Sequence, residues 1–322
     1  MARFILQRLI LLIPVLALIS VLSFALLVSM PGDPLDMLVF GDPSITRADI
    51  KHLKELYGLN DPFPVRYGKW MLQVMQGNLG YSRQYKVPVT ELVLPRLQNT
   101  LVLASVALLI SLIFAIPLGI YSAEHSYTLG DYAATIFAFA GYAVPGFWLG
   151  LVMIIVFAVY LSWFPAGGMI SADIKPDWAS ALSDRAWHLV MPVFVLGLAS
   201  MTTWARYMRS SLLEVIRQDY IQTARAKGLS ERVITYRHAI KNALIPMVTL
   251  FANTVPILIG GSVIVETVFS YPGMGKLLYD TVLANDFSVA MAILMSLALL
   301  VVFCNLLADV TYGFLDPRIR YE

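Results

Sequence analysis

The segment "ARAKGLSERVITYRHAIKNALIP", residues 224–246, differs from the rest of this chain. It contains five Lys and Arg residues, although the chain as a whole is 58% hydrophobic and has a mean hydropathy of +0.72. Charged side chains of this density stay in water, because burying them without partners is costly. One glycine, Gly228, interrupts the helix-forming residues around it. The segment therefore predicts a water-exposed, interrupted helical surface between strongly apolar neighbours.

Long runs without charged residues lie on both sides of this segment. Only 14% of the 322 residues are charged, whereas roughly 25% is usual in soluble domains. About 20 apolar residues cross the hydrocarbon core of a bilayer as a helix. A soluble core does not need six such runs, so the sequence predicts an all-α integral membrane protein with six transmembrane helices. The runs occupy residues 9–32, 97–123, 132–172, 186–205, 242–265 and 287–308.

The third run, residues 132–172, is long enough to conceal two crossings. However, Pro145 and Gly146 would divide it unevenly, and "SWFPAGGMI" at 162–170 is typical of the exit from a helix. We therefore expect one long crossing from about residue 132 to residue 161.

Loop charge predicts the orientation of the six crossings. Lys and Arg accumulate in short cytoplasmic loops. Twelve of them lie on the side that holds the N-terminus, the loop 206–242 and the C-terminal tail, and eight of these twelve belong to that loop. The other side holds three, outside the long segment 33–96. Both termini are therefore expected in the cytoplasm.

These crossings divide the chain into four parts. Residues 1–32 are the N-terminus and first transmembrane helix, and 33–96 form an extracytoplasmic segment. Residues 97–308 are the core of five further helices, including the loop 206–242, and 309–322 are a cytoplasmic tail.

Two stretches of the extracytoplasmic segment predict short amphipathic helices, "TRADIKHLKELYGL" at 46–59 and "VRYGKWMLQVMQGNLG" at 65–80. In the first, Thr46 suits the N-cap and Gly58 the stop; the second ends at Gly77. Packing over the outer mouth of the bundle is one interpretation of these helices, and a gating or docking surface is the other.

The loop 206–242 predicts three helical pieces. The first continues the fourth crossing, and the second runs from Asp219 to Lys227, where Gly228 stops it. Ser230 then suits the N-cap of a third piece that runs toward Pro246. The apolar face expected for this third piece consists of Val233, Tyr236, Ile240 and Leu244.

The second piece is rich in small residues, which would let its backbone enter the cleft of another protein. Arg225 and Lys227 would meet acidic groups at the rim of that cleft. The alternative is simple attraction of a basic loop to anionic lipid, worth about 1 kcal/mol per Lys or Arg. Attraction to lipid does not require a glycine, such as Gly228, that ends one helix just before the next begins. The pattern therefore favours a rigid helical segment that inserts into a soluble partner.

The same segment resembles the cytoplasmic EAA loop of ABC-transporter permeases. The general pattern is Glu-Ala-Ala, three residues and Gly, where this chain has Gln222-Thr223-Ala224 and Gly228. The general pattern also has Leu-Pro 13 residues after the glycine, where this chain has Ile240-Lys241, and Pro246 comes later. At both of these differences the chain resembles one branch of the ABC-transporter permeases, the inner-membrane permeases of dipeptide, oligopeptide and nickel importers.

Further motifs similar to that branch cover nearly the whole chain. The block "DYIQTARAKGLS" at 219–230 with "HAIKNALIP" at 238–246 is specific to it. Other matches are "PGDP" at 31–34, "YGLNDP" at 57–62, "GNLGYS" at 77–82, "ETVFSYPGMG" at 266–275 and "NLLADVTYGFLDPRIRY" at 305–321. The resemblance is strongest to the first (B-type) permease subunit of such importers.

This resemblance implies the type I ABC importer fold in a prokaryotic cytoplasmic (inner) membrane. It also implies the partners, namely a second permease subunit, two ATPase subunits that bind ATP and Mg²⁺, and an extracytoplasmic substrate-binding protein. The EAA loop would be the coupling helix that inserts into an ATPase subunit. Its implied contact residues are Asp219, Tyr220, Gln222, Thr223, Ala224, Arg225, Ala226, Lys227 and Gly228.

Missing catalytic motifs and the polar residues inside the apolar runs narrow the class of function. The chain has no G-x-x-x-x-G-K-[ST] phosphate loop and no cluster typical of a metal site, so we expect a transport subunit without catalysis or a cofactor of its own. Polar residues within apolar runs are candidates for a substrate path, or for hydrogen bonds within the bundle. These candidates are Asn99, Asn253, Glu266 and Asn305.

Two functions remain open at this point. The first is a permease for peptides or a related small solute, driven by ATP through partner subunits. The second is a stand-alone secondary transporter or channel, which would often show internal repeats or charged relays at mid-bilayer. The sequence shows neither a clear internal repeat nor a charged residue inside any predicted crossing, and it does not identify the solute.

Overall fold

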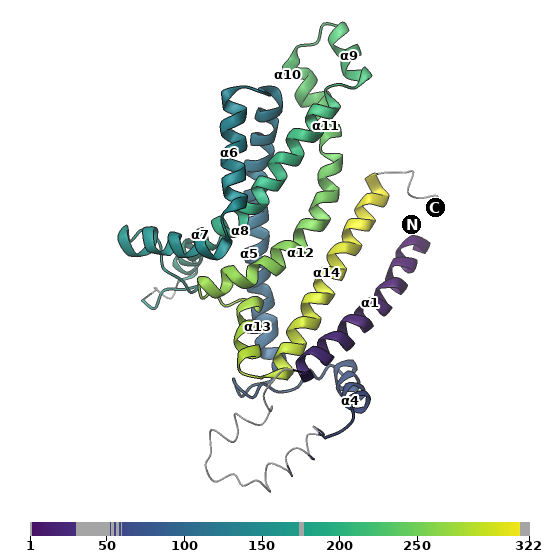
Figure 1. Ribbon diagram of the computed structural model, residues 1–322, viewed down its shortest axis with the longest axis vertical. Coiled ribbons are helices and arrows are strands. Elements are labelled where there is room, and N and C mark those ends of the chain that lie inside the picture. The colour runs from purple at the N-terminus through teal and green to yellow at the C-terminus, as the bar shows by residue number, and fades with distance from the viewer. Residues whose placement is uncertain are drawn as a thin grey trace.

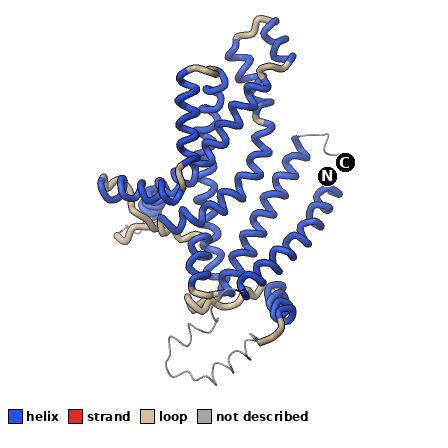
Figure 2. Tube along the Cα trace, viewed as in Figure 1, coloured by secondary structure: helices blue, strands red, loops and turns tan. Residues whose placement is uncertain are grey.

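The computed structural model describes residues 2–29, 52, 55, 58, 60–173 and 177–315. Within these residues the regular elements are helices joined by short loops, as Figure 2 shows. An isolated bridge between Tyr81 and Pro88 is the nearest approach to strand pairing in this part of the chain. The prediction of an all-α protein is confirmed.

In the part of the chain that the structure describes, four helices contain stretches long and apolar enough to cross a membrane (Figure 1). Two of them, α5 (Val89–Glu124) and α8 (Trp178–Val215), pack against each other extensively. The other two, α1 (Ala2–Ser29) and α14 (Phe287–Leu315), also lie side by side. These helices correspond to the first, second, fourth and sixth predicted crossings.

Small residues allow α5 and α8 to approach closely. The Ser111 hydroxyl of α5 donates to the Gly197 carbonyl of α8 at 2.8 Å. A Cβ added at Gly119 would lie 2.6 Å from the Ala205 carbonyl oxygen, so any larger residue at 119 would push the two helices apart. Small residues serve this purpose in membrane proteins, where helix association depends on close packing.

The third apolar run does not form the single helix predicted from residue 132 to residue 161. It is divided into α6 (Leu129–Ala143), α7 (Gly146–Met153) and the π-helix η1 (Ile154–Tyr160). Pro145 has an extended backbone with ψ 132°. Because proline lacks an N–H and disfavours helix in the preceding residue, α6 ends there and α7 runs across the direction of α6 (Figure 1).

The fifth run forms α12 (Ile245–Val268), which changes direction part-way along its length in Figure 1. Pro256 lies inside this helix, and a proline removes one backbone hydrogen bond and bends the helix. The short helix α13 (Met274–Leu283) then returns the chain to α14.

The predicted helix in residues 65–80 is confirmed as α4 (Phe63–Met75), and Gly77 follows it with φ +78°. Tyr67 and Trp70 of α4 pack against Phe24 of α1, with ring centroids 5.6 and 5.7 Å apart. The Ser20 and Tyr67 hydroxyls lie 2.7 Å apart. The predicted helix at 46–59 lies almost wholly outside the described residues.

The two ends of the bundle carry different elements. The segment with α9 (Asp219–Ala226) stands at one end, and α4 and α13 lie at the opposite end (Figure 1). The N-terminal end of α1 and the C-terminal end of α14 both point toward the α9 end. The predicted boundaries at 97 and 309 fall inside α5 and α14.

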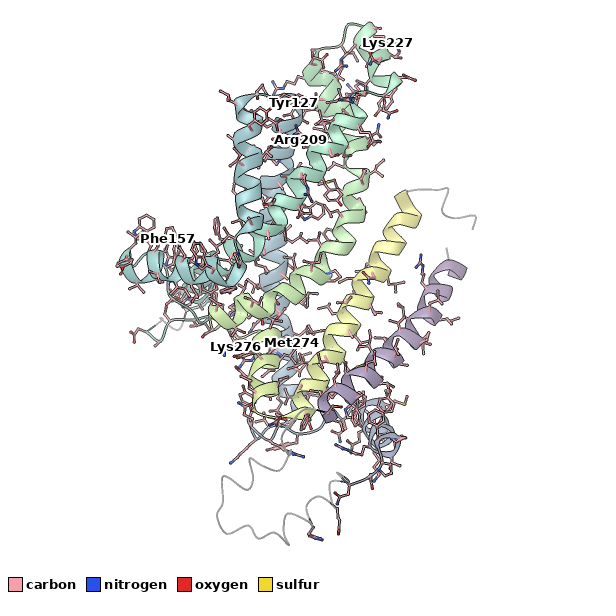
Figure 3. All side chains as sticks on the ribbon, in the orientation of Figure 1. Tyr127, Phe157, Arg209, Lys227, Met274 and Lys276 are labelled. Carbon is pink, nitrogen blue, oxygen red and sulfur yellow. The ribbon has the colours of Figure 1, made fainter. Side chains whose placement is uncertain are left out.

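An ion pair between a half-buried arginine and a buried carboxylate ties the first turn of α6 to α8. The Arg209 guanidinium donates to both carboxylate oxygens of Asp131, at 2.9 and 2.8 Å. The Tyr127 backbone N–H adds a third bond at 2.9 Å. Figure 3 places Tyr127 and Arg209 near the α9 end of the bundle. Arg209, and then the backbone bond, hold the pKa of Asp131 below its ordinary value of 3.8.

This pair predicts a loss of stability in acid. A carboxyl whose pKa is lowered by folding stabilises the protein above pH 3.8 and loses that contribution as the pH falls through the lowered pKa. Asp131→Asn should cost about 3 kcal/mol of unfolding free energy at neutral pH and should remove this part of the acid dependence. Denaturant unfolding in detergent at several pH values measures both effects. Glu214→Gln, at an exposed position of α8, should leave the free energy of unfolding at neutral pH unchanged.

Candidate functional site

The helix α9 is held against the rest of its loop by two buried side chains. Ile221 is 0% exposed and Ala224 is 7% exposed, and α9 packs against the π-helix η2 (Ile234–Ala239). Figure 3 shows Lys227 at the far end of this segment, away from the bundle. The second helical piece predicted from the sequence is thus present, with ends within one residue of those expected.

Gly228 closes α9 with the hydrogen bonds of a Schellman motif. Its own N–H donates to the Arg225 carbonyl at 2.9 Å, and the Leu229 N–H donates to the Ala224 carbonyl at 3.4 Å. The φ of Gly228 is +77°, a conformation that side chains with a Cβ disfavour. A Cβ added there would meet nothing within 4 Å, so the space around Gly228 is open to another molecule.

An ion pair joins the helices before and after Gly228, and we call this bend between them the glycine corner. The Arg225 guanidinium donates to both carboxylate oxygens of Glu231, at 2.8 and 3.1 Å. Glu231 begins α10 (Glu231–Val233), so the pair joins α9 to the following helix. Arg225 also holds the pKa of Glu231 below its ordinary value. Arg225 was expected to meet an acidic group of a partner, and here its partner belongs to the same chain.

A second hydrogen bond closes the base of the corner. The Asn242 amide donates to the Tyr220 hydroxyl at 2.7 Å. Asn242 belongs to α11 (Ile240–Ala243), which leads into α12. The N-cap expected at Ser230 has the extended backbone of a cap, but its side chain makes no capping bond. The corner is therefore held by Gly228, by the Arg225–Glu231 pair and by the Tyr220–Asn242 bond.

The predicted contact residues do not all face outward. Ala224 is buried, so we assign it to packing. The remaining members are exposed, and we call them together the α9 surface: Asp219, Tyr220, Gln222, Thr223, Arg225, Ala226, Lys227 and Gly228.

The apolar face expected for the third helical piece is confirmed for Ile240 and Leu244, which are partly buried and pack against the core, but it is wrong for the other two residues. Val233 and Tyr236 are exposed, at 38% and 58%. The buried residues are instead Ile234, Thr235, Ala239 and Ala243. The reason is the π-helix η2, whose wider turns shift the register that a 3.6-residue period predicts.

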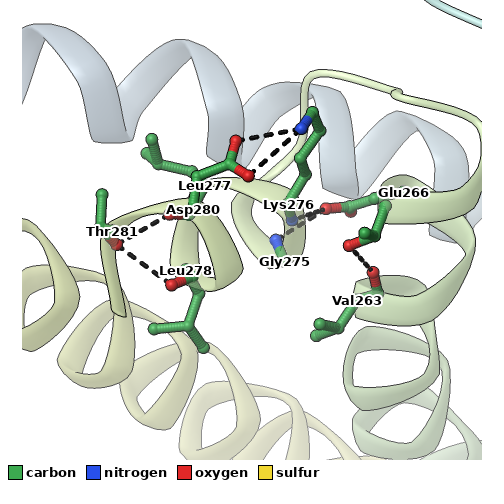
Figure 4. Close-up of polar contacts among 9 residues, drawn as sticks. Val263, Glu266, Gly275, Lys276, Leu277, Leu278, Asp280 and Thr281 are labelled. Atoms are coloured by element: carbon green, nitrogen blue, oxygen red, sulfur yellow. Dashed lines mark hydrogen bonds and ion pairs between the residues drawn. The ribbon is translucent and has the colours of Figure 1, made fainter. Parts of the chain in front are cut away.

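At the opposite end of the bundle, Glu266 organises the start of α13. Its carboxylate accepts the backbone N–H groups of Gly275 and Lys276 at 2.6 and 3.0 Å (Figure 4). The helix dipole favours an anion at this position. Glu266 is 0% exposed. Figure 3 shows Met274 and Lys276 at this end of the molecule.

Helix α5 contributes to the same network. The Thr100 hydroxyl donates to Glu266 at 2.7 Å and accepts the Met274 N–H at 2.8 Å. The Asn99 amide donates to the Pro272 carbonyl at 2.8 Å. We call these contacts the Glu266 network. It joins α5, α12 and α13 by hydrogen bonds.

The four residues predicted for a substrate path are not brought together. Asn99 and Glu266 take part in the Glu266 network, where their polar atoms are engaged within the chain. Asn305 is exposed on α14. The side chain of Asn253 lies outside the described residues. The structure therefore gives Asn99 and Glu266 packing and capping roles in this conformation.

Sequence reasoning missed the two glycines that make this network possible. A Cβ at Gly273 would overlap the Glu266 carboxyl group. A Cβ at Gly275 would lie 2.8 Å from Val263 Cγ2 and 2.9 Å from the Val263 backbone nitrogen. The motif "YPGMG" at 271–275 carries this signal, because glycines permit such close approach.

Comparison with known proteins identifies the family. Residues 115–321 match the family described as binding-protein-dependent transport system inner membrane component. Residues 1–104 match the family of the N-terminal part of such membrane components.

Relatives of full length extend this match. The chain is 44% identical over 322 residues to an oligopeptide transport system permease protein of Bacillus subtilis (strain 168), covering 100% of both chains. It is 34% identical over 339 residues to a dipeptide transport system permease protein of Escherichia coli (strain K12), again covering 100% of both.

Solved structures show the same fold. A chain of the MetNI methionine ABC transporter, in an inward-facing conformation, aligns with a TM-score of 0.56 at 18% identity, covering 70% of this chain and 97% of that one. A second crystal form aligns with a TM-score of 0.54. With the family models and the full-length relatives, the chain belongs to the binding-protein-dependent transport system inner membrane components and is a permease subunit of an ATP-driven importer.

Proposed function

We propose that this subunit pairs with a second permease to form the translocation path for short peptides. The two full-length relatives described above are named as oligopeptide and dipeptide transport permeases, which supports this class of solute. Membership of the family favours the ATP-driven importer over a stand-alone secondary transporter or channel. An extracytoplasmic binding protein would deliver the solute to the end of the bundle that carries α4 and α13.

The proposed orientation places the α9 end in the cytoplasm. Eight Lys and Arg residues in the loop 206–242 support this side, because such residues accumulate in cytoplasmic loops. The ends of α1 and α14 that point the same way agree with cytoplasmic termini. In this proposal α6 with α7, and α12, supply the two crossings beyond the four long helices, for six in total.

The proposed coupling element is the α9 surface. It would sit in a groove of an ATPase subunit, and two such subunits would bind ATP and Mg²⁺. One observation carries this proposal: α9 is a short, largely exposed helix that stands at one end of the bundle and is nevertheless fixed at both of its own ends. A flexible loop could not transmit a movement of the ATPase subunit to the transmembrane helices. The glycine corner and its two side-chain bonds instead keep α9 in one position relative to them.

Thr223 offers a test that leaves the corner intact. Its side chain is exposed on the α9 surface, and its hydroxyl donates to the Asp219 carbonyl of the same helix at 3.0 Å. Thr223→Trp should therefore fold normally but block close contact. When the tagged subunit is extracted with its complex, copurification of the ATPase subunits should fall at least about tenfold, because a central contact contributes 2 kcal/mol or more.

The matched control is Gln73→Trp, at an exposed position of α4 on the opposite end. It adds the same bulk and should leave the amount of copurified ATPase unchanged. Retention of the ATPase subunits by the Thr223 variant would reject the α9 surface as their contact.

A further inference from the structure

A second surface of the same loop remains without a function. Four exposed residues follow one another at intervals of four along α10, η2, α11 and the start of α12: Val233, Arg237, Lys241 and Ile245. The two apolar members are 38% and 53% exposed. We call this set the basic stripe.

The π-helix η2 keeps this stripe straight. In an α-helix with 3.6 residues per turn, residues four apart drift around the axis by about 40° at each step. A π-helix has more residues per turn, so the drift is cancelled where the stripe passes through η2 (Ile234–Ala239). The two cations therefore lie on one side of the helix between two apolar residues.

The cations of the stripe are not neutralised by the chain. Among the described residues, no carboxylate lies within 4 Å of the Arg237 guanidinium or the Lys241 ammonium group. The nearby acid Glu231 is already engaged with Arg225 on the α9 side of the corner. Two neighbouring positive charges on one face thus remain available to an anion from outside the chain.

The stripe also lies where the chain enters its apolar surroundings. Lys241 belongs to α11, and Ile245 is the first residue of α12, whose following residues are predominantly apolar. A long cationic side chain at such a border can lay its methylene groups along apolar neighbours and keep its charge at the headgroup level. Exposed apolar residues beside such charges are typical of helices that touch a membrane surface.

We propose that the basic stripe binds the headgroup phosphate of an anionic phospholipid. Arg237 and Lys241 would hold the phosphate, while Ile245 would contact the upper part of an acyl chain. Opposite charge selects an anionic lipid over a zwitterionic one. That this leaflet is the cytoplasmic one rests on the orientation proposed above, but the binding itself does not depend on the coupling role of α9.

Native mass spectrometry of the full-length subunit can test the site. The protein would be released from detergent in the presence of equal amounts of phosphatidylglycerol and phosphatidylcholine, and the ratio of the two bound lipids would be measured. In Arg237→Gln/Lys241→Gln this ratio should fall about thirtyfold, the combined contribution of two cations at an anionic lipid. Arg237→Lys/Lys241→Arg, which preserves both charges, should keep the ratio within about threefold.

The control is Arg217→Gln/Arg232→Gln, which removes the same charge from the same loop outside the stripe. This variant should retain the preference for phosphatidylglycerol. An equal loss in both neutralised variants would mean that only net charge matters and would overturn the site. A stripe variant that keeps the preference but loses the ATPase subunits on copurification would show a protein contact instead, and would also overturn it.

Discussion

Gly228→Asp should reduce ATP-dependent uptake and copurification of the ATPase subunits by at least about a hundredfold. Two effects combine in this change. A residue with a Cβ at φ +77° costs about 1–2 kcal/mol of local conformational energy. The new carboxylate also occupies the open space beside the α9 surface, where loss of one central contact costs 2–4 kcal/mol. Uptake of labelled peptide into proteoliposomes with the complete complex measures the result.

The chain offers a closely matched control for this variant. Gly77 has φ +78°, nothing lies within 4 Å of its added Cβ, and its N–H donates to the Val74 carbonyl at 2.9 Å. It closes α4 as Gly228 closes α9, but at the opposite end of the bundle. Gly77→Asp should therefore carry the same strain and leave ATPase copurification intact. Equal losses in the two variants would attribute the effect to strain and remove the support for coupling through α9.

Gly275→Ala should strongly destabilise the subunit. The added Cβ would approach the Val263 backbone nitrogen to 2.9 Å and would displace the N–H that now donates to Glu266. Overpacking of this kind costs 1–3 kcal/mol, and the disturbed buried hydrogen bond adds to it. We expect a total of about 3 kcal/mol, or a midpoint of thermal unfolding lower by about 8 °C, measured by size-exclusion chromatography after heating in detergent.

Gly68→Ala is the control for the loss of glycine itself. This residue lies inside α4, and nothing lies within 4 Å of its added Cβ. Alanine favours helix over glycine by about 1 kcal/mol, so this variant should be slightly more stable than the natural protein. If Gly275→Ala were equally stable, the close contact between α12 and α13 would be refuted.

The ends of α9 could be predicted from the sequence because their signals are local. Asp219 at the start and Gly228 after the end each act on the turn in which they lie. The face of the following helix could not be predicted in this way. Residues 234–239 have no composition that distinguishes a π-helix from an α-helix, and Val233 and Tyr236 were therefore expected on the buried face, although they are exposed.

The division of the third apolar run, residues 132–172, into separate helices could not be predicted from local signals either. Pro145 was visible in the sequence, but a proline can either bend a helix or end it. The outcome here depends on distant partners, since Gly150 of α7 packs against Val268 and Phe269 at the end of α12. The role of Glu266 could not be predicted for the same reason. An acidic residue beside an apolar run indicates a functional site, whereas its capping role depends on α13 packing so that its first N–H groups reach the Glu266 carboxylate.

The length of α5 has a mechanical consequence. Its 36 residues form a rod about 54 Å long, which is hydrogen-bonded to α8 near its middle, through Ser111, and to the Glu266 network in its N-terminal half, through Thr100. A rod of this length that rocks by about 15° around its midpoint, a rotation seen in other rigid-body transitions, carries its two tips about 7 Å in opposite directions. A single rotation of this rod would therefore move the groups at its two ends in opposite directions, without any helix having to unwind.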